Sequence, residues 1–363
     1  MGETFSQSQP PGVEKAKKDV DDGFLMRQQM AQKMLRFLDT AQNIQALDGK
    51  TTEEVLSNEE SRRQFILGLS PEHYGDLLIG VNGILRNRNR SAWGMDGKDV
   101  VIGDSDHARW DFPEFEDKQD LLSQSLRAAK EMLERGDTIE NVAILLSSTV
   151  SAVHPFNDGN GRTGKFLLTT INKGYSGDQK DILKEVLTSS EFSNSVNVSL
   201  IQGAITAVLE REIGMVKDNE RLRVRTDQRE SDWNFPDTVL PEKQELFKRQ
   251  FTRSPLHMKE AIFSYFKDTI DSYMDESGDI NFNQIIPDLT NVAIDKIIGI
   301  WKHLKRRQVE LIIDCIANPD KEEYQVERMS KDGEKRKESI LNMYKQKIKR
   351  STDEAIYDKV FGG

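Results

Sequence analysis

The feature that most constrains the fold is the run TIENVAILLSSTVSAV at positions 138–153. Its apolar residues recur at helical intervals, and small alanine and serine residues stand between them. Because such a helix can pack closely on more than one side, we expect it to lie at the centre of its domain. The helix should end at His154, since Pro155 disfavours helical geometry in the residue before it.

Similar helical spacing fills most of the remaining chain, which predicts a mainly α fold. Ser70 followed by Pro71 is a good N-terminal cap and first turn, and Gly174 is a typical helix stop. In the first half of the chain, helices are expected at 22–47, 58–69, 71–89, 116–136, 138–153 and 162–173.

One segment of the first half departs from this helical pattern. The turn signal Asp96-Gly97 lies between Trp93 and a β-branched run at 100–102. These residues predict a short β-hairpin, followed by a loop that leads into the next helix.

The composition limits the classes of function. Acidic residues outnumber basic ones by 61 to 51, which argues against a protein whose main task is coating nucleic acid. The single cysteine, Cys315, rules out an internal disulfide and suits a reducing compartment. No run approaches the about 20 apolar residues that a transmembrane helix needs. We expect a cytoplasmic protein without a transmembrane segment, and export into a host cell stays open.

The stretch HPFNDGNGRTGK at 154–165 bridges two of the expected helices. Gly159, Asn160 and Gly161 allow the backbone to turn its N–H groups inward, beside the positive end of the following helix. Arg162 and Lys165 are three residues apart in the first turn of that helix, so both cations are expected on one face. Free amides with two cations suit a polyphosphate.

The remaining polar residues of this stretch complete a reactive site. Asp158 offers a carboxylate, the type of ligand that Mg²⁺ prefers beside phosphates. His154 is neutral near pH 7 and lies close enough to serve as a general base, while Phe156 is expected to anchor the loop. Taken singly, a histidine before proline is more often a capping or core residue, and Gly-Asn-Gly is a common turn. It is the combination within twelve positions that favours a site.

This stretch resembles the signature of the Fic family, His-x-Phe-x-Asp/Glu-Gly-Asn-Gly-Arg-x-x-Arg. The resemblance extends over residues 70–215, because the hairpin segment and the two flanking helices also match the family's α-helical core. Fic proteins typically transfer AMP from ATP to a hydroxyl side chain of a target protein, and some use other nucleotides or phosphocholine donors. The matching positions are His154, Phe156, Asp158, Gly159, Asn160, Gly161 and Arg162.

The resemblance implies a role for each of these positions. His154 would deprotonate the target hydroxyl, Asp158 would bind Mg²⁺, and residues 159–161 would hold the α- and β-phosphates of ATP. Arg162 would neutralise the diphosphate leaving group. The hairpin would be a flap that docks the target by strand pairing. Its docking residues are Lys98, Val100, Val101 and Ile102.

The last signature position departs from the family, because Lys165 stands where arginine is usual. Lysine keeps the charge but lacks the planar, two-pronged guanidinium group, so we expect weaker orientation of the terminal phosphate. Three consequences stay open: slower adenylylation, a different phosphate donor, or nucleotide binding without transfer. In the last case the chain would be a regulatory module whose nucleotide site gates a contact with a partner.

Many Fic proteins resemble one another in an inhibitory helix with the pattern Ser/Thr-x-x-x-Glu-Gly/Asn. In this chain only Glu140 is followed by Gly or Asn, and Gly136 stands four residues before it. No such inhibitor is visible in the sequence. We therefore expect control by a separate inhibitor protein or by a diverged helix, for which the N-terminal helices are the candidate.

The sequence predicts a second, C-terminal domain beyond about residue 217. Helices at 255–274, 280–289 and from 291, with a β-branched strand near 309–315, resemble a winged helix-turn-helix, which some Fic proteins append. A basic cluster there could face DNA, although a solvated helix face is the commoner reason for such a cluster. The cluster is Lys296, Lys302, Lys305, Arg306 and Arg307. The expected units are an N-terminal helical region (1–69), the Fic core (70–216), a linker (217–240), the winged-helix-like domain (241–318) and a charged helix or tail (319–363).

Overall fold

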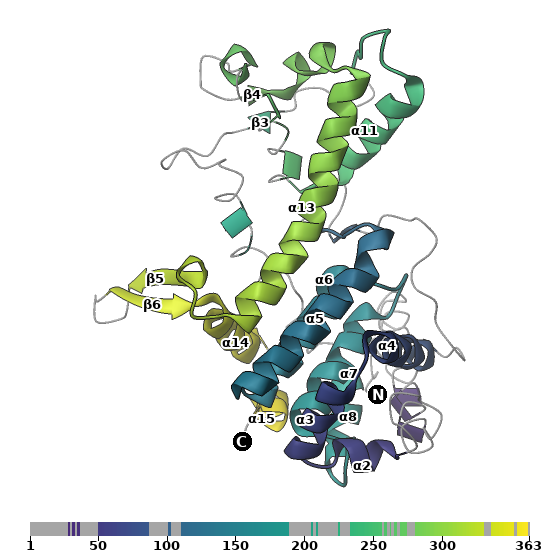
Figure 1. Cartoon of the computed structure of the whole chain (residues 1–363), viewed down its shortest axis with the longest axis vertical. Coiled ribbons are helices and arrows are strands. Elements are labelled where there is room, and N and C mark those ends of the chain that lie inside the picture. The colour runs from purple at the N-terminus through teal and green to yellow at the C-terminus, as the bar shows by residue number, and fades with distance from the viewer. Residues whose placement is uncertain are drawn as a thin grey trace, which may run out of the picture.

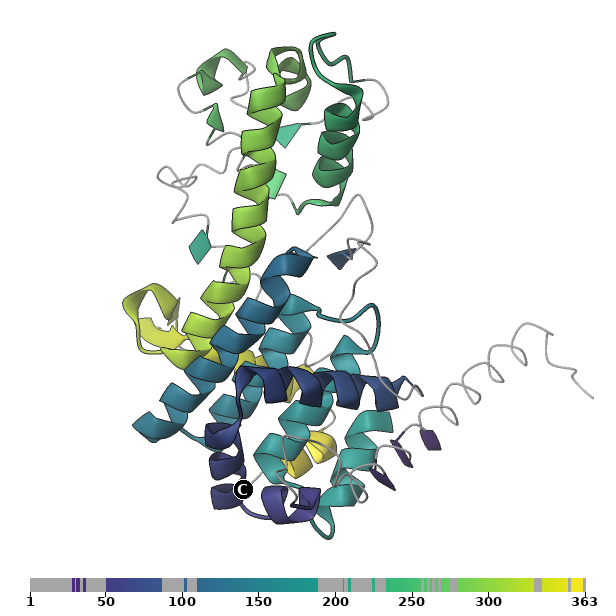
Figure 2. The ribbon, with the colours of Figure 1, turned by 45° about the vertical axis from the view of Figure 1, so that its right-hand side comes forward.

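The computed structural model shows a chain built mainly of helices (Figure 1). A bundle surrounds two central helices, and one long helix extends away from it toward a second group of elements (Figures 1 and 2). The structure describes residues 50–86, 101–102, 110–188, 233–255, 280–329, 335–351 and 354–361, with short pieces at 28–29, 31–32, 35–36, 205, 208–209, 224–225, 258–259, 262, 265–266 and 269–273. Most of the helix predicted at 22–47 lies outside these residues.

The helices before the hairpin begin where their capping residues predict. Asn58 caps one of them by accepting a hydrogen bond from the Ser61 backbone N–H, and Ser70 caps the next before Pro71. Thr51 and Glu54 form a reciprocal capping box at the first. These helices are α2 (Thr52–Leu56), α3 (Glu59–Gly68) and α4 (Pro71–Leu85).

The centre of the bundle is the pair α6 and α7, as the sequence predicts. Twelve of the fifteen residues of α6 are buried, and the helix packs on α5, α7 and the long helix α13. Thr138 caps its start, and Gly174 ends α7. The bounds are α5 (Phe115–Arg135), α6 (Ile139–Val153), α7 (Asn160–Lys173) and α8 (Gln179–Thr188), with α13 at Asn291–Ala317.

Gly164 of α7 lies directly against Ser147 and Ser151 of α6. A Cβ atom at this position would be 3.1 Å from Ser151 Oγ and 3.3 Å from the backbone oxygen of Ser147. The absence of a side chain therefore lets the two helices approach. This crossing fixes the distance between the end of α6 and the start of α7.

Residues 101–102 of the predicted hairpin form a strand, and the structure pairs this strand with a later segment. Strand β1 (Val101–Ile102) pairs antiparallel with β2 (Trp110–Asp111), in the segment that was expected to be a loop. The Trp110 indole N–H donates to the Ala152 carbonyl, which attaches β2 to the end of α6. Residues 91–100, with the turn signal, lie outside the described residues.

Beyond residue 233, an aromatic cluster joins α11 (Pro241–Arg253) to α13. Trp233 packs edge-on against Phe251, with ring centroids 5.0 Å apart, and Phe247 lies 5.4 Å from Trp301 of α13. The end of the predicted linker is therefore packed rather than solvated. In place of the helix predicted at 280–289, the structure has the 3₁₀ turns η4 (Phe282–Gln284) and η5 (Ile286–Asp288), after η3 (Ile270–Tyr273). Strand β3 (Val224–Arg225) pairs in parallel with β4 (Ile280–Asn281).

The strand predicted near 309–315 is wrong, because these residues belong to the 27-residue helix α13. Val309 and Ile312 are fully buried where the C-terminal half of α13 packs on α5 and α6. Packing around a helix outweighs the modest preference of β-branched residues for strands. The winged-helix assignment of 241–318 stays a prediction, as do the domain boundaries.

The last part of the chain is also more ordered than the charged helix or tail that we predicted. It begins with η6 (Glu322–Tyr324) and a hairpin of β5 (Gln325–Met329) and β6 (Lys335–Ser339). Helices α14 (Ile340–Ser351) and α15 (Glu354–Phe361) follow, and α15 packs on α7 and α8. Tyr344 and Val360 are buried. The sequence did not indicate this packing, because the few apolar residues stand among alternating charges and give no clear helical periodicity.

Among the described residues, no helix is both long enough and apolar enough to cross a membrane.

Replacement of Gly164 by leucine is expected to lower the free energy of unfolding by about 2–3 kcal/mol, because the added side chain must push α6 and α7 apart. Urea denaturation followed by circular dichroism measures this change. The matched control is Gly299→Leu, since Gly299 lies in α13 with nothing within 4 Å of an added Cβ. The control should be neutral or slightly stabilising. Equal stability of the two variants would contradict the close crossing.

Candidate functional site

The loop between α6 and α7 begins and ends in left-handed backbone geometry. His154 closes α6 with φ +50°, and it is the one non-glycine residue with positive φ in the described parts of the chain. Gly159 precedes α7 with φ +83°. A positive φ is unusual for histidine and often accompanies a functional site. The two left-handed residues reverse the chain sharply between the crossing helices.

Asn160 holds this loop closed through its side chain. Its Oδ1 accepts from the Phe156 N–H at 3.0 Å, and its Nδ2 donates to the Phe156 carbonyl at 2.6 Å. Phe156 is buried, as the anchoring role predicts. The Asn160 side chain therefore shapes the loop, and only its backbone is left to meet a ligand.

The carboxylate of Asp158 lies between two arginines at the start of α7. Its Oδ2 is 3.3 Å from Arg162 Nη2 and 3.4 Å from Arg86 Nε, and its Oδ1 accepts from the Gly159 N–H at 2.7 Å. The Asp158 side chain is 59% exposed, so this group of charges faces solvent. With two positive charges to one negative, the cluster keeps a net positive charge for an anion.

The glycines of the loop have different surroundings. A Cβ at Gly159 would come within 2.8 Å of Asn82 Nδ2 and 3.3 Å of Arg86 Cγ, so only glycine fits under α4. A Cβ at Gly161 would meet nothing within 4 Å. The first turn of α7 therefore has open space on the side of Gly161, beside Arg162 and Asp158. A phosphate group can approach the helix N-terminus there.

Two side chains contact His154, one at its ring and one at its backbone carbonyl. Its ring lies 4.2 Å from the Phe112 ring, centroid to centroid, and its backbone carbonyl accepts from Lys118 Nζ at 3.0 Å. Burial, followed by the charge of Lys118, lowers the pKa of His154 from its ordinary 6.5 to about 4. The ring is therefore uncharged at neutral pH and able to accept a proton.

The two cations predicted to share one face are placed differently. Arg162 is partly exposed and donates to the Leu85 carbonyl as well as pairing with Asp158. Lys165 is only 2% exposed. A contact between Lys165 and a terminal phosphate therefore stays a prediction. Of the flap residues, Lys98 and Val100 lie outside the described residues, and 101–102 form β1.

Sequence reasoning missed Arg86 and Asn82, which α4 brings to the loop. The Asn82 amide donates to the Asp158 carbonyl at 3.0 Å and to Thr163 Oγ1 at 3.1 Å. A signal was present, since these two polar residues are four apart in a largely apolar helix and so share one face. Phe112 and Lys118 gave no local signal, because only the fold brings them to His154.

A divalent metal would find one carboxylate here. Within the described parts of the chain, no three histidine, cysteine, aspartate or glutamate side chains gather as a metal site. Mg²⁺ commonly binds through one or two carboxylates together with water and substrate phosphates. Asp158 fits that pattern, provided that its carboxylate gives up its ion pairs with Arg86 and Arg162 when it binds the metal.

Residues 73–171 match the family model described as the Fic/DOC family. The chain carries a Fic domain. The match covers α4 through α7 and contains Arg86, His154 and Asp158. No curated protein and no solved structure matches the chain. A Fic domain indicates a Fic-type transferase in general.

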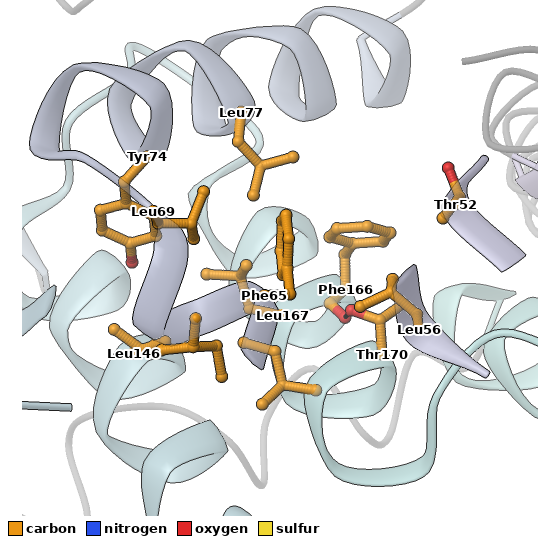
Figure 3. Close-up of a pocket in the computed structure, with 12 residues that line it drawn as sticks. Thr52, Leu56, Phe65, Leu69, Tyr74, Leu77, Leu146, Phe166, Leu167 and Thr170 are labelled. Atoms are coloured by element: carbon orange, nitrogen blue, oxygen red, sulfur yellow. Dashed lines mark hydrogen bonds between the residues drawn. The ribbon is translucent and has the colours of Figure 1, made fainter. Parts of the chain in front are cut away.

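A small apolar cavity within this Fic domain is separate from the site (Figure 3). It lies among α2, α3, α4, α6 and α7, with a volume of about 30 Å³, and the side chains of Leu77, Leu146 and Phe166 point into it. That volume suits about one water molecule rather than a nucleoside base. We therefore regard the cavity as a packing defect of the core.

The low pKa of His154 predicts a pH dependence of stability. Between about pH 6.5 and 4 the unfolded chain binds a proton at this position and the folded protein does not, so stability falls as the pH drops through this window. In the wild type this proton should lower the free energy of unfolding by on the order of 3 kcal/mol between pH 6.5 and 4, and the His154→Gln variant should lack this contribution. Urea denaturation of both proteins at several pH values measures the difference, and parallel curves would contradict the buried, uncharged imidazole.

Proposed function

We propose that this Fic domain transfers AMP, or another nucleoside monophosphate, from a Mg²⁺-bound nucleoside triphosphate to a hydroxyl side chain of a protein. The observation that carries the proposal is the α6–α7 junction, where an uncharged histidine is followed four residues later by a carboxylate between two arginines. These are the groups that phosphoryl chemistry needs: a base, a metal ligand and cations for the leaving group.

His154 would take the proton of the attacking hydroxyl. A pKa near 4 makes a weak base in the free protein. A bound polyphosphate would place negative charge beside the ring and so raise this pKa toward neutrality, where general bases are most effective. The base would therefore become effective when its co-substrate is present.

Asp158 would hold the Mg²⁺ ion, which neutralises phosphate charge when bound. Arg162 and Arg86 would then leave the carboxylate and turn to the phosphate oxygens, because their guanidinium groups suit such oxygens well. The backbone N–H groups at Gly161 and its neighbours would complete the cradle at the start of α7. Lys165 would contact the terminal phosphate.

The protein acceptor would dock along β1. Within the described residues β1 pairs on one side only, with β2, so its second edge can accept an extended segment by main-chain hydrogen bonds. The acceptor residue would be a serine, threonine or tyrosine that this pairing brings to His154. A separate inhibitor protein would act by covering the same junction.

Incubation with ATP labelled at the α-phosphate and Mg²⁺ tests this function. The wild type should transfer label to itself or to a protein target, and His154→Ala should lower the rate about 100-fold or more, because the base is lost. The control is His303→Ala, since His303 is exposed on α13. Label in the control but not in His154→Ala supports the proposal.

Two other outcomes would contradict it. If the wild type and Lys165→Arg both bind nucleotide but transfer no label, the chain is better described as a regulatory module. If label is transferred only from other nucleotides or from a phosphocholine donor, the enzyme uses a donor other than ATP.

Arg86 gives a second test, because it belongs to no signature position. If Arg86 turns to the phosphates, Arg86→Ala should weaken Mg²⁺–ATP binding about tenfold, as measured by calorimetry. The matched control is Arg63→Ala, whose guanidinium pairs with Glu59 on α3. Unchanged or tighter binding in Arg86→Ala would mean that Arg86 only neutralises Asp158.

A further inference from the structure

The middle of α13 carries a buried lysine that contacts β2 and the start of α5. Lys305 is 1% exposed, and its Nζ lies 3.0 Å from Asp111 Oδ2 and 3.0 Å from Glu114 Oε1. Gln250 of α11 completes the cluster, accepting from Lys305 at 3.0 Å and donating to Asp111 at 2.8 Å. A charge buried this deeply requires such partners, so the cluster fixes the relative position of four segments: α13, α11, β2 and the start of α5. It also means that Lys305 cannot face DNA, contrary to the sequence expectation.

The two segments that Lys305 holds both continue to His154. Asp111 is followed in the chain by Phe112, whose ring contacts the imidazole. Glu114 precedes the first turn of α5, where Lys118 donates to the His154 carbonyl. The two residues that contact His154, Phe112 and Lys118, therefore lie one and four positions after residues that are ion-paired to α13.

Neighbouring contacts reinforce this attachment. Gln308, one turn further along α13, donates to the Asp111 carbonyl at 3.1 Å. Arg306 pairs with Asp117 and Asp120 on both sides of Lys118. In both views the C-terminal half of α13 lies along α5 (Figures 1 and 2). We call the pair α11 and α13 the α11–α13 frame, because β2 and the first turn of α5, which lead to Phe112 and Lys118, are attached to it.

We propose that Lys305 is a positioning residue for His154: by holding Asp111 and Glu114, it fixes the Phe112 ring against the imidazole and the Lys118 ammonium at the His154 backbone carbonyl. The role of His154 as base rests on the proposed function, but its positioning by Lys305 does not.

The charges of the cluster support this assignment. Burial alone would lower the pKa of Lys305, but the carboxylates of Asp111 and Glu114 outweigh burial and raise it. Lys305 therefore carries its charge at neutral pH. Removing that charge alone would leave Asp111 buried without its cation, whereas removing both charges avoids this penalty.

The test compares Lys305→Met, the double variant Lys305→Met/Asp111→Asn, and the control Lys302→Met, since Lys302 is exposed on the same helix. Circular dichroism first establishes that each full-length protein is folded. Histidine-ring NMR spectra then follow the titration of His154, whose signal is assigned by its absence in His154→Gln. This readout needs no enzymatic activity.

In the wild type and in Lys302→Met, His154 should titrate well below its ordinary range. In the Lys305 variants its midpoint should rise by about one pH unit or more, because the ring gains solvent. If Lys305→Met fails to fold, the His154 midpoint in the double variant tests the proposal instead. A folded variant without Lys305 whose His154 titrates as in the wild type would overturn the proposal.

Transfer kinetics provide a second readout. With the positioning lost, kcat should fall about tenfold or more while the KM for ATP stays within about twofold, since Lys305 lies away from the phosphate cradle. If the wild type shows no transfer, the proposed function fails, and the NMR result still decides the role of Lys305. Equal loss in Lys302→Met would show a general effect and overturn the specific role.

Discussion

The sharp reversal between α6 and α7 is the constraint on which the site depends. Two tightly crossed helices, with Gly164 at the contact, leave little room for the six residues between them. The chain turns by placing His154 and Gly159 in left-handed geometry, and Asn160 closes the loop on Phe156. A histidine, a carboxylate and a helix N-terminus are brought into one short loop as a consequence of this turn.

Much of this arrangement could be predicted because its signals are local. Ser70 caps α4, Gly174 ends α7, and Pro155 follows His154, where α6 ends; all three are single residues with a known backbone preference. The loop stretch also indicated an anion site from its residues alone. A Fic domain over 73–171 agrees with the resemblance seen there.

The errors arose where contacts between distant residues decided the structure. The β-branched residues near Val309 form a helix because they pack against α5 and α6, and the local sequence does not indicate this packing. Trp110 lies in a strand rather than in a loop, and its indole N–H donates to the end of α6, a contact that no local pattern indicates. The ion pair of Lys305 with Asp111 joins residues far apart in the chain, so a basic cluster that resembled a surface patch is partly interior.

Two levels of organisation meet at His154. The loop places Asp158 and the start of α7, and the α11–α13 frame is attached to Phe112 and Lys118, which contact His154. In the proposed function, the first level binds the co-substrate and the second holds the base ready for it. Such a division would let control act on the base without altering nucleotide binding.

The most direct measurement is a crystal structure of the protein with Mg²⁺ and a non-hydrolysable ATP analogue. Our account predicts phosphates at the first turn of α7, the metal on Asp158, and the guanidinium groups of Arg86 and Arg162 turned from the carboxylate to phosphate oxygens. A nucleotide bound elsewhere, with both arginines still on Asp158, would contradict it.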